Sequence, residues 1–329
     1  MRLQHPILNI PIGVFPITFG FAGLSSATMK AEETLGAPYF VSTVLSVFTV
    51  ILLICFIILL GMKTRHNPSN LIKDFLHLPG KALLSSISCT VIIISGLPAI
   101  AEGLQFSLWL TASAVHLAIT GCFIGQWLRS KKFTNDGFDL RFFIPITGCM
   151  MVTVQGSQFL HVQLFWFLLS VSILFWLLLS GQFLFSLKSP KLFSNEKLPM
   201  LFILISPPSI AFIAHATVVG TTTLVSETLF YLATSLSILV IFIHSRKFRG
   251  HFSLCCWSAP FPLAALTLAS FEMSGHKQTA SFFYASLGLF FLLTMLIVAL
   301  TIITGLKFKN KYICQSNVFQ PDFAVREIN

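Results

Sequence analysis

Apolar residues dominate long stretches of this chain, and short polar segments separate these stretches. Ten of them hold the roughly 20 mostly apolar residues that a helix needs to cross the hydrocarbon core of a bilayer. The ten predicted spans lie near residues 11–29, 40–62, 80–101, 106–128, 142–159, 163–187, 198–219, 225–245, 254–274 and 281–306. The pattern therefore predicts an all-α integral membrane protein with ten transmembrane helices.

The prolines divide the predicted spans into two alternating kinds. Every odd-numbered span contains proline and no even-numbered span does, the prolines being Pro11, Pro16, Pro98, Pro145, Pro207, Pro208, Pro260 and Pro262. A proline inside a helix leaves a carbonyl without its donor, and such backbone must face protein or water rather than lipid. We therefore expect five helical hairpins, each with a proline-kinked inner helix and an unbroken outer helix, around a central pore. The alternative is that the prolines only shape helix packing.

Composition agrees with a lipid environment. The chain is 55% hydrophobic and 10% charged, against about 25% charged in a soluble domain. Its 35 phenylalanines are too many for one water-soluble core. The net charge of +10 does not require a nucleic-acid partner, because the lysines and arginines form short clusters between the spans, as membrane topology demands.

The distribution of lysine and arginine predicts the orientation. Nineteen of these residues fall in the two termini and in the loops after even-numbered spans, and two fall in the loops after odd-numbered spans. Because positive charge favours cytoplasmic loops, both termini are predicted to be cytoplasmic. We expect one transmembrane domain over residues 1–306 and a polar cytoplasmic tail over residues 307–329.

Few residues inside the spans carry reactive chemistry. Their interiors hold no lysine or arginine, and His116 and His215 are the titratable groups well inside. Each histidine could relay protons, or could simply hydrogen-bond to neighbouring backbone. The seven cysteines form no C-x-x-C pair, and no nucleophile–base set or phosphate loop is visible. We therefore expect no enzyme activity, no metal site, no cofactor and no disulfide framework.

Four motifs in the odd spans resemble one family. They are P-I-G-V-F-P-I-T-F-G at 11–20, R-F-F-I-P-I-T-G at 141–148, S-P-P-S-I-A at 206–211 and W-S-A-P-F-P-L-A-A-L at 257–266. Together they resemble the TehA and plant slow-anion-channel family, also called the tellurite-resistance/dicarboxylate transporter group. The continuation G-C-M-M-V after the second motif departs from the commoner asparagine-containing version.

The resemblance implies a fold, an assembly and a gate. It implies ten helices in five hairpins around a central pore, homotrimers with one pore in each protomer, and conduction of small inorganic or organic anions. It also implies that a phenylalanine in span 9 occludes the pore, and the matching residue is Phe261. The further candidates for lining or kinking the pore are Gly13, Pro16, Gly20, Pro98, Pro145, Gly148, Pro207, Pro208, Pro260 and Pro262.

These observations predict a multi-pass anion channel of the bacterial inner membrane. We expect an uncharged pore that passes monovalent anions. Two alternatives remain open: a proton-coupled carrier of C4-dicarboxylates or an exporter of tellurite or other oxyanions, and a membrane scaffold that transports nothing.

Overall fold

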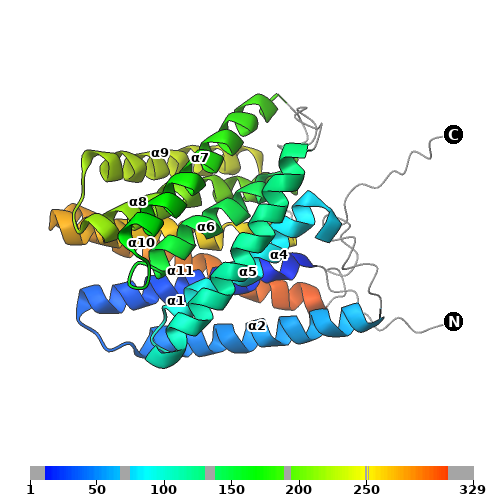
Figure 1. Cartoon of the computed structure of the whole chain (residues 1–329), viewed down its shortest axis with the longest axis horizontal. Helices are drawn as coiled ribbons and strands as arrows, with labels where there is room; N and C mark the ends of the chain where they lie inside the picture. Colours follow the sequence, from blue (N-terminus) through cyan, green and yellow to red (C-terminus); the bar gives the residue numbers. More distant parts are fainter. Residues whose placement is uncertain are drawn as a thin grey trace.

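The protein is an assembly of long helices (Figure 1). The computed structural model describes residues 12–66, 75–129, 138–188, 194–248, 250 and 252–309. No strand occurs in these ranges. Pro11 and nearly all of the predicted tail, residues 310–329, lie outside the described residues.

Ten helical segments correspond to the ten predicted spans. Nine of those in the described ranges are long and apolar enough to cross a membrane, and a tenth, Leu140–Gln155, is apolar but shorter. The α-helices are α1 (Phe15–Leu35), α2 (Phe40–His66), α4 (Leu78–Ser95), α5 (Glu102–Arg129), α6 (Phe143–Gln155), α7 (Val162–Ser186), α8 (Ser206–Val219), α9 (Leu224–Lys247), α10 (Pro260–Lys277) and α11 (Ala280–Lys309). The predicted all-helical membrane protein is confirmed.

Four of these α-helices follow a 3-10 helix, three of them directly and α10 after the single residue Ala259. The four 3-10 segments are η2 (Ile12–Val14) before α1, η3 (Leu140–Phe142) before α6, η5 (Leu198–Ile205) before α8 and η6 (Leu254–Ser258) before α10. The motif prolines fall in the first turn of the α-helix that follows. Proline is well tolerated there because the first-turn N–H groups have no partner within the α-helix. The prolines therefore mark a change of helix type, where we had expected kinks within continuous α-helices.

Five helices are much more buried than the others. In the segments that begin at Ile12, Leu78, Leu198 and Leu254, between 61% and 94% of the most apolar 18-residue stretch is buried inside the protein. In the remaining long helices the share is 17–33%. The shorter α6 is also buried along nearly its whole length. The buried set is therefore α1, α4, α6, α8 and α10, which come from the five odd-numbered spans.

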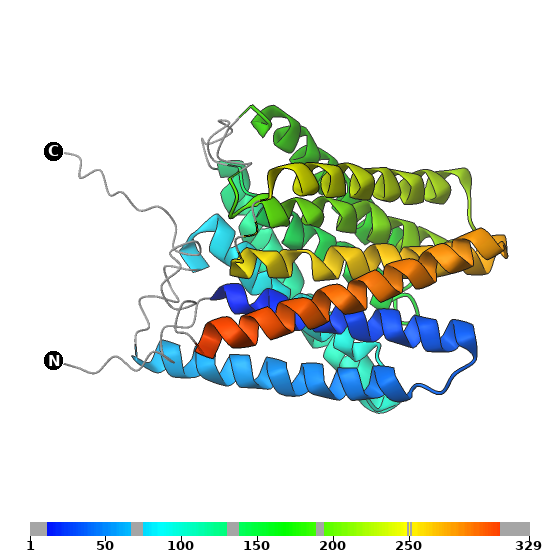
Figure 2. The ribbon, with the colours of Figure 1, turned by 180° about the vertical axis from the view of Figure 1, so that it is seen from behind.

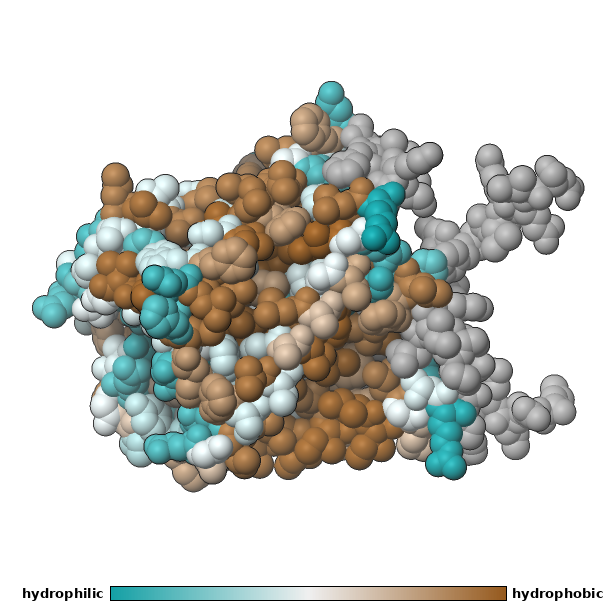
Figure 3. Space-filling view, viewed as in Figure 1, coloured by the Kyte–Doolittle hydropathy of each residue, from teal (hydrophilic) through white to brown (hydrophobic). Residues whose placement is uncertain are grey.

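The buried helices contact one another in a closed cycle. α1 packs against α4, α4 against α6, α6 against α8, α8 against α10, and α10 returns to α1. Each also packs against the exposed helix that follows it in the chain. Figure 2 shows α11 running beside α10 and α1. The outer helices expose isoleucine, leucine, valine and phenylalanine side chains, and Figure 3 shows hydrophobic residues covering the middle of one face.

Candidate functional site

A cavity of about 30 Å³ lies among the five buried helices. All five helices, or their 3-10 extensions, contribute side chains to its wall. It occupies the level at which the 3-10 segments give way to α-helices, because η3, η5 and η6 line it together with the first turns of α1, α6, α8 and α10. Its size admits about two water-sized species. The cavity is therefore bordered by elements of all five helices of the cycle.

Two stacked phenylalanine rings form one part of the wall. Phe261, in the first turn of α10, lies with its ring centroid 3.8 Å from that of Phe19 on α1, and the ring planes differ by 18°. The two side chains are 5% and 6% exposed, so little solvent reaches either ring. Both residues line the cavity. The sequence singled out Phe261, and the structure adds Phe19 as its partner.

Glycines allow α1 and α10 to approach closely behind these rings. A Cβ atom on Gly20 would lie 3.0 Å from Cβ of Pro260. A Cβ atom on Gly23 would lie 2.9 Å from Cβ of Ala264 and 3.3 Å from a ring carbon of Phe261. A larger residue at either glycine would push the helices apart. The two glycines therefore fix how far Phe261 stands from α1.

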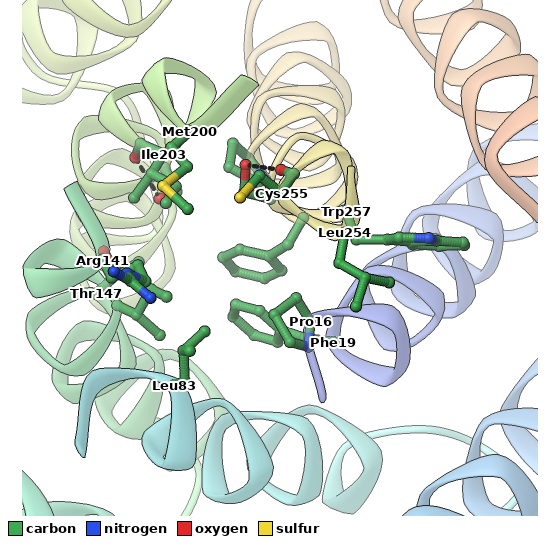
Figure 4. Close-up of a pocket in the computed structure, with 15 residues that line it drawn as sticks. Pro16, Phe19, Leu83, Arg141, Thr147, Met200, Ile203, Leu254, Cys255 and Trp257 are labelled. Atoms are coloured by element: carbon green, nitrogen blue, oxygen red, sulfur yellow. Dashed lines mark hydrogen bonds between the residues drawn. The ribbon is translucent and has the colours of Figure 1, made fainter. Parts of the chain in front are cut away.

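Arg141 brings a charge into the cavity wall. Its guanidinium donates from Nε to Oδ1 of Asp139 at 2.8 Å and from Nη2 to Oδ2 at 2.6 Å. The same carboxylate accepts from the backbone N–H of Arg141 at 2.9 Å and so caps η3. Figure 4 shows Arg141 and Thr147 across the space from Pro16 and Phe19. From the sequence we expected an uncharged pore and a span that begins one residue after this arginine, whereas the structure places the arginine in the cavity wall.

The electrostatics of the pair are set by its burial. Burial raises the pKa of the Asp139 carboxyl, but the charge of Arg141 and its hydrogen bonds have the larger combined effect. The pKa of Asp139 therefore lies below its ordinary value, and the carboxylate stays ionised. The pair places one positive and one negative charge beside the cavity. Its nominal net charge is zero.

Three hydroxyl groups in the wall donate to backbone carbonyls. Thr147 donates to Phe143 at 2.8 Å, Ser206 donates to the carbonyl of Ile203 at 2.8 Å, and Ser258 donates to that of Pro199 at 3.0 Å or of Cys255. Their hydrogens point into the backbone, so the lone pairs remain for the cavity. Among the side chains that line it, Arg141 is the one that carries positive charge.

Comparison with known protein families shows to which family the chain belongs. A family model described as a voltage-dependent anion channel, SLAC1, matches residues 9–306. The chain belongs to the SLAC1 family. The match covers all ten helical segments except the last three residues of α11, and the predicted resemblance to the TehA and plant slow-anion-channel family is confirmed. Membership indicates anion transport across a membrane rather than catalysis. A search of curated protein sequences finds no significant match.

The candidates predicted to line or kink a SLAC1-type pore occupy different places. Phe261, Pro16 and Pro262 line the cavity. Gly20 and Pro260 form the contact between α1 and α10, whereas Pro98 is exposed beyond the C-terminal end of α4. The others are buried in or beside first turns of inner helices but outside the cavity wall, and they are Gly13, Pro145, Gly148, Pro207 and Pro208.

Neither interior histidine reaches the cavity of this SLAC1-family protein. His116 is fully buried on α5, and its ring nitrogens hydrogen-bond with Ser88 and with the carbonyl of Pro145. His215 lies on α8 with its ring against that of Trp166 on α7, their centroids 5.6 Å apart. Neither position favours proton relay through the cavity.

Ion pairs lie at the C-terminal ends of α1 and α10, whereas the cavity lies at the N-terminal ends of these helices. Lys30 of α1 lies 3.3 Å from Glu272 of α10, and His276 lies 3.3 Å from the other oxygen of that glutamate. Lys277 of α10 lies 2.6 Å from Glu227 of α9. These pairs join the C-terminal ends of α1 and α10 to each other and the C-terminal end of α10 to the N-terminal end of α9. Within the ranges that the structure describes, no three histidine, cysteine, aspartate or glutamate side chains are grouped to hold a metal.

Two residues of the candidate site were not singled out by the sequence analysis. Phe19 is one of 35 phenylalanines, and only its partner stood between two prolines. Its place in the motif P-I-T-F-G, one residue before Gly20, was the available signal. Arg141 precedes Pro145 by one helical turn, so its nearness to a proline-bearing first turn could have pointed to the inner bundle.

Proposed function

We propose that the chain is an anion channel whose path follows the axis of the five buried helices and is closed by Phe261 stacked on Phe19. Family membership supports anion transport, and the closed cycle of buried helices supports a path within one protomer. The observation that carries the proposal is the ring stack at the cavity. An apolar constriction closes a pore by excluding water, and two rings exclude it better than one.

We further propose that the channel favours large monovalent anions. The wall is mostly apolar, and its one cationic side chain is held by a carboxylate. Such a wall offers little to a doubly charged anion in exchange for its hydration shell. Nitrate should therefore pass more readily than chloride, and malate poorly. Malate flux that equals nitrate flux and needs a proton gradient would favour the dicarboxylate carrier instead.

The gate is tested by anion flux into liposomes. Replacement of Phe261 by alanine should raise nitrate flux severalfold, and replacement by leucine should raise it less. Because one side of the ring borders the cavity, the alanine variant should lose less than the about 3–5 kcal/mol typical of a fully packed phenylalanine.

Phe271 provides the matched control on the same helix. It is 1% exposed, it packs against Phe290 and it does not line the cavity. Replacement of Phe271 by alanine should lower the melting temperature without raising flux. If Phe261→Ala behaves like Phe271→Ala, the ring is only core packing and the gate proposal fails.

Topology and assembly remain proposals that rest on the sequence. The 19-to-2 distribution of lysine and arginine supports cytoplasmic termini in a bacterial inner membrane, and a C-terminal reporter active only in the periplasm would contradict it. The broad apolar faces of the outer helices leave room for a homotrimer with one pore in each protomer. A stable monomer in a detergent-corrected mass measurement would remove the trimer and leave the pore.

A further inference from the structure

We propose that the cavity beside the two rings is an anion-binding site, in which Arg141 attracts the anion and Asp139 keeps the binding weak enough for the anion to leave. The inference rests on the proposed channel function and deepens it. It assigns opposite roles to two neighbouring residues, one cationic and one anionic.

The position of the guanidinium makes it the attracting group. Arg141 lines the cavity and its side chain is 11% exposed, so its charge acts in a region of low dielectric constant. The hydroxyls of Thr147, Ser206 and Ser258 direct their hydrogens to backbone carbonyls. Arg141 is therefore the side chain in the wall that can supply positive charge to an anion.

The geometry of Asp139 makes it the opposing group. Its two carboxylate oxygens take the Nε and Nη2 hydrogens of Arg141, and the Arg141 N–H fixes the carboxylate on the same short 3-10 segment. Residues two positions apart thus hold each other in place. An anion that approaches the guanidinium meets a fixed negative charge in contact with it.

This arrangement suits conduction better than a lone arginine would. A buried arginine without a counter-charge would bind an anion tightly and hold it. A permeating ion needs a site attractive enough to draw it in and weak enough to release it. Asp139 lowers the affinity of Arg141 to that range. Removal of the carboxylate should therefore tighten binding and slow transport at the same time.

The experiment combines binding and flux. Binding of nitrate to the purified full-length protein is measured as the rise in melting temperature with nitrate concentration, with gluconate keeping the ionic strength constant. Flux is measured in liposomes with Phe261→Ala added to each variant, so that the rings do not limit it. We expect Asp139→Asn to bind nitrate about tenfold more tightly and to reach a lower maximal flux.

Two further variants complete the test. Arg141→Gln should weaken nitrate binding, but it leaves Asp139 buried without its counter-ion. The double variant Asp139→Asn/Arg141→Gln removes both charges and should fold while binding nitrate more weakly than wild type. Arg246→Gln is the control, because Arg246 is exposed on α9 against Phe242, away from the cavity.

The outcomes separate the site from the channel. Equal nitrate stabilisation in wild type, Asp139→Asn and the double variant would overturn the anion site, even if Phe261→Ala conducts. Tighter binding in Asp139→Asn with an undiminished maximal flux would overturn the release role of Asp139. Nitrate stabilisation that follows the variants, without flux in any Phe261→Ala protein, would leave the site and remove the channel.

Discussion

Nε2 of His116 lies 2.9 Å from the carbonyl oxygen of Pro145, so a ring on the exposed helix α5 bonds to the first turn of the buried helix α6. Its other ring nitrogen, Nδ1, lies 2.9 Å from Oγ of Ser88 on α4. One fully buried side chain therefore joins three helices. This favours the interpretation of His116 as a structural residue over that of a proton relay.

Replacement of His116 should destabilise the protein through these bonds. In His116→Phe the ring volume is kept, but the hydrogen bonds of the imidazole to the Ser88 hydroxyl and to the Pro145 carbonyl are lost. Because Ser88 still donates to the carbonyl of Ser85, the expected cost is about 0.5–1.5 kcal/mol for each lost bond. Thermal unfolding of the detergent-solubilised protein measures the loss. If His116→Phe melts at the wild-type temperature, the hydrogen bonds contribute nothing.

Gly148 should tolerate no side chain. A Cβ atom there would overlap the imidazole of His116 and press on Sγ of Cys89. Gly148→Ala should therefore lower the melting temperature by several degrees, and His116→Ala should partly restore it by making room. Gly121, on α5 with nothing within 4 Å, is the control, because alanine there should be neutral or stabilising. Equal effects at the two glycines would contradict the predicted overlap.

Phe19 should act together with Phe261. If the stacked rings close one constriction, Phe19→Ala alone should raise nitrate flux only partly, because Phe261 still obstructs the path. The double variant should exceed the sum of the two single effects, since contacting residues are not additive. A liposome flux measurement over the four proteins gives the coupling. A double variant no more active than Phe261→Ala would show that Phe19 does not obstruct the path.

The Asp139–Arg141 pair predicts a dependence of stability on pH. The pKa of Asp139 in the folded protein is lower than its ordinary value of 3.8, so the unfolded chain binds the proton first as pH falls. The contribution of the pair is complete above that ordinary value and is lost as pH falls through the folded value. Melting temperature should therefore drop more steeply below about pH 4 in wild type than in Asp139→Asn/Arg141→Gln. Parallel pH profiles would contradict the shift.

The alternation of proline-containing and proline-free spans predicted which helices are buried. Pro16, Pro145, Pro207 and Pro260 lie on helices that are buried, and the proline-free spans are the exposed ones. The physical reason holds in the structure, because backbone that lacks a donor needs protein around it. The alternation of prolines does not predict whether a proline kinks a continuous α-helix or marks the change from a 3-10 helix to an α-helix. Pro260 has no N–H to donate to the carbonyl of Cys256. The N–H of Ala259 donates to that carbonyl instead, in a 3-10 hydrogen bond of 3.3 Å.

The site was less predictable than the fold, because its partners are distant in sequence. Phe261 was found through its two flanking prolines and the family resemblance, but nothing local distinguishes Phe19 from the other phenylalanines. Because Arg141 is charged, we placed it outside the predicted span. Its ion pair with Asp139, two residues earlier, allows it to be buried. Hydropathy alone cannot detect such local neutralisation.

The contact between α1 and α10 also has a consequence for biosynthesis. Phe19 is made near the beginning of the chain, and its stacking partner Phe261 belongs to the last helix but one. The glycine-containing surface of α1 that packs against α10 stays without this partner while the seven α-helices between them are synthesised. A chain that stalls before Pro260 lacks Phe261 and leaves that surface of α1 without α10. If Phe261 closes the path as we propose, the path can be sealed only after near-complete translation.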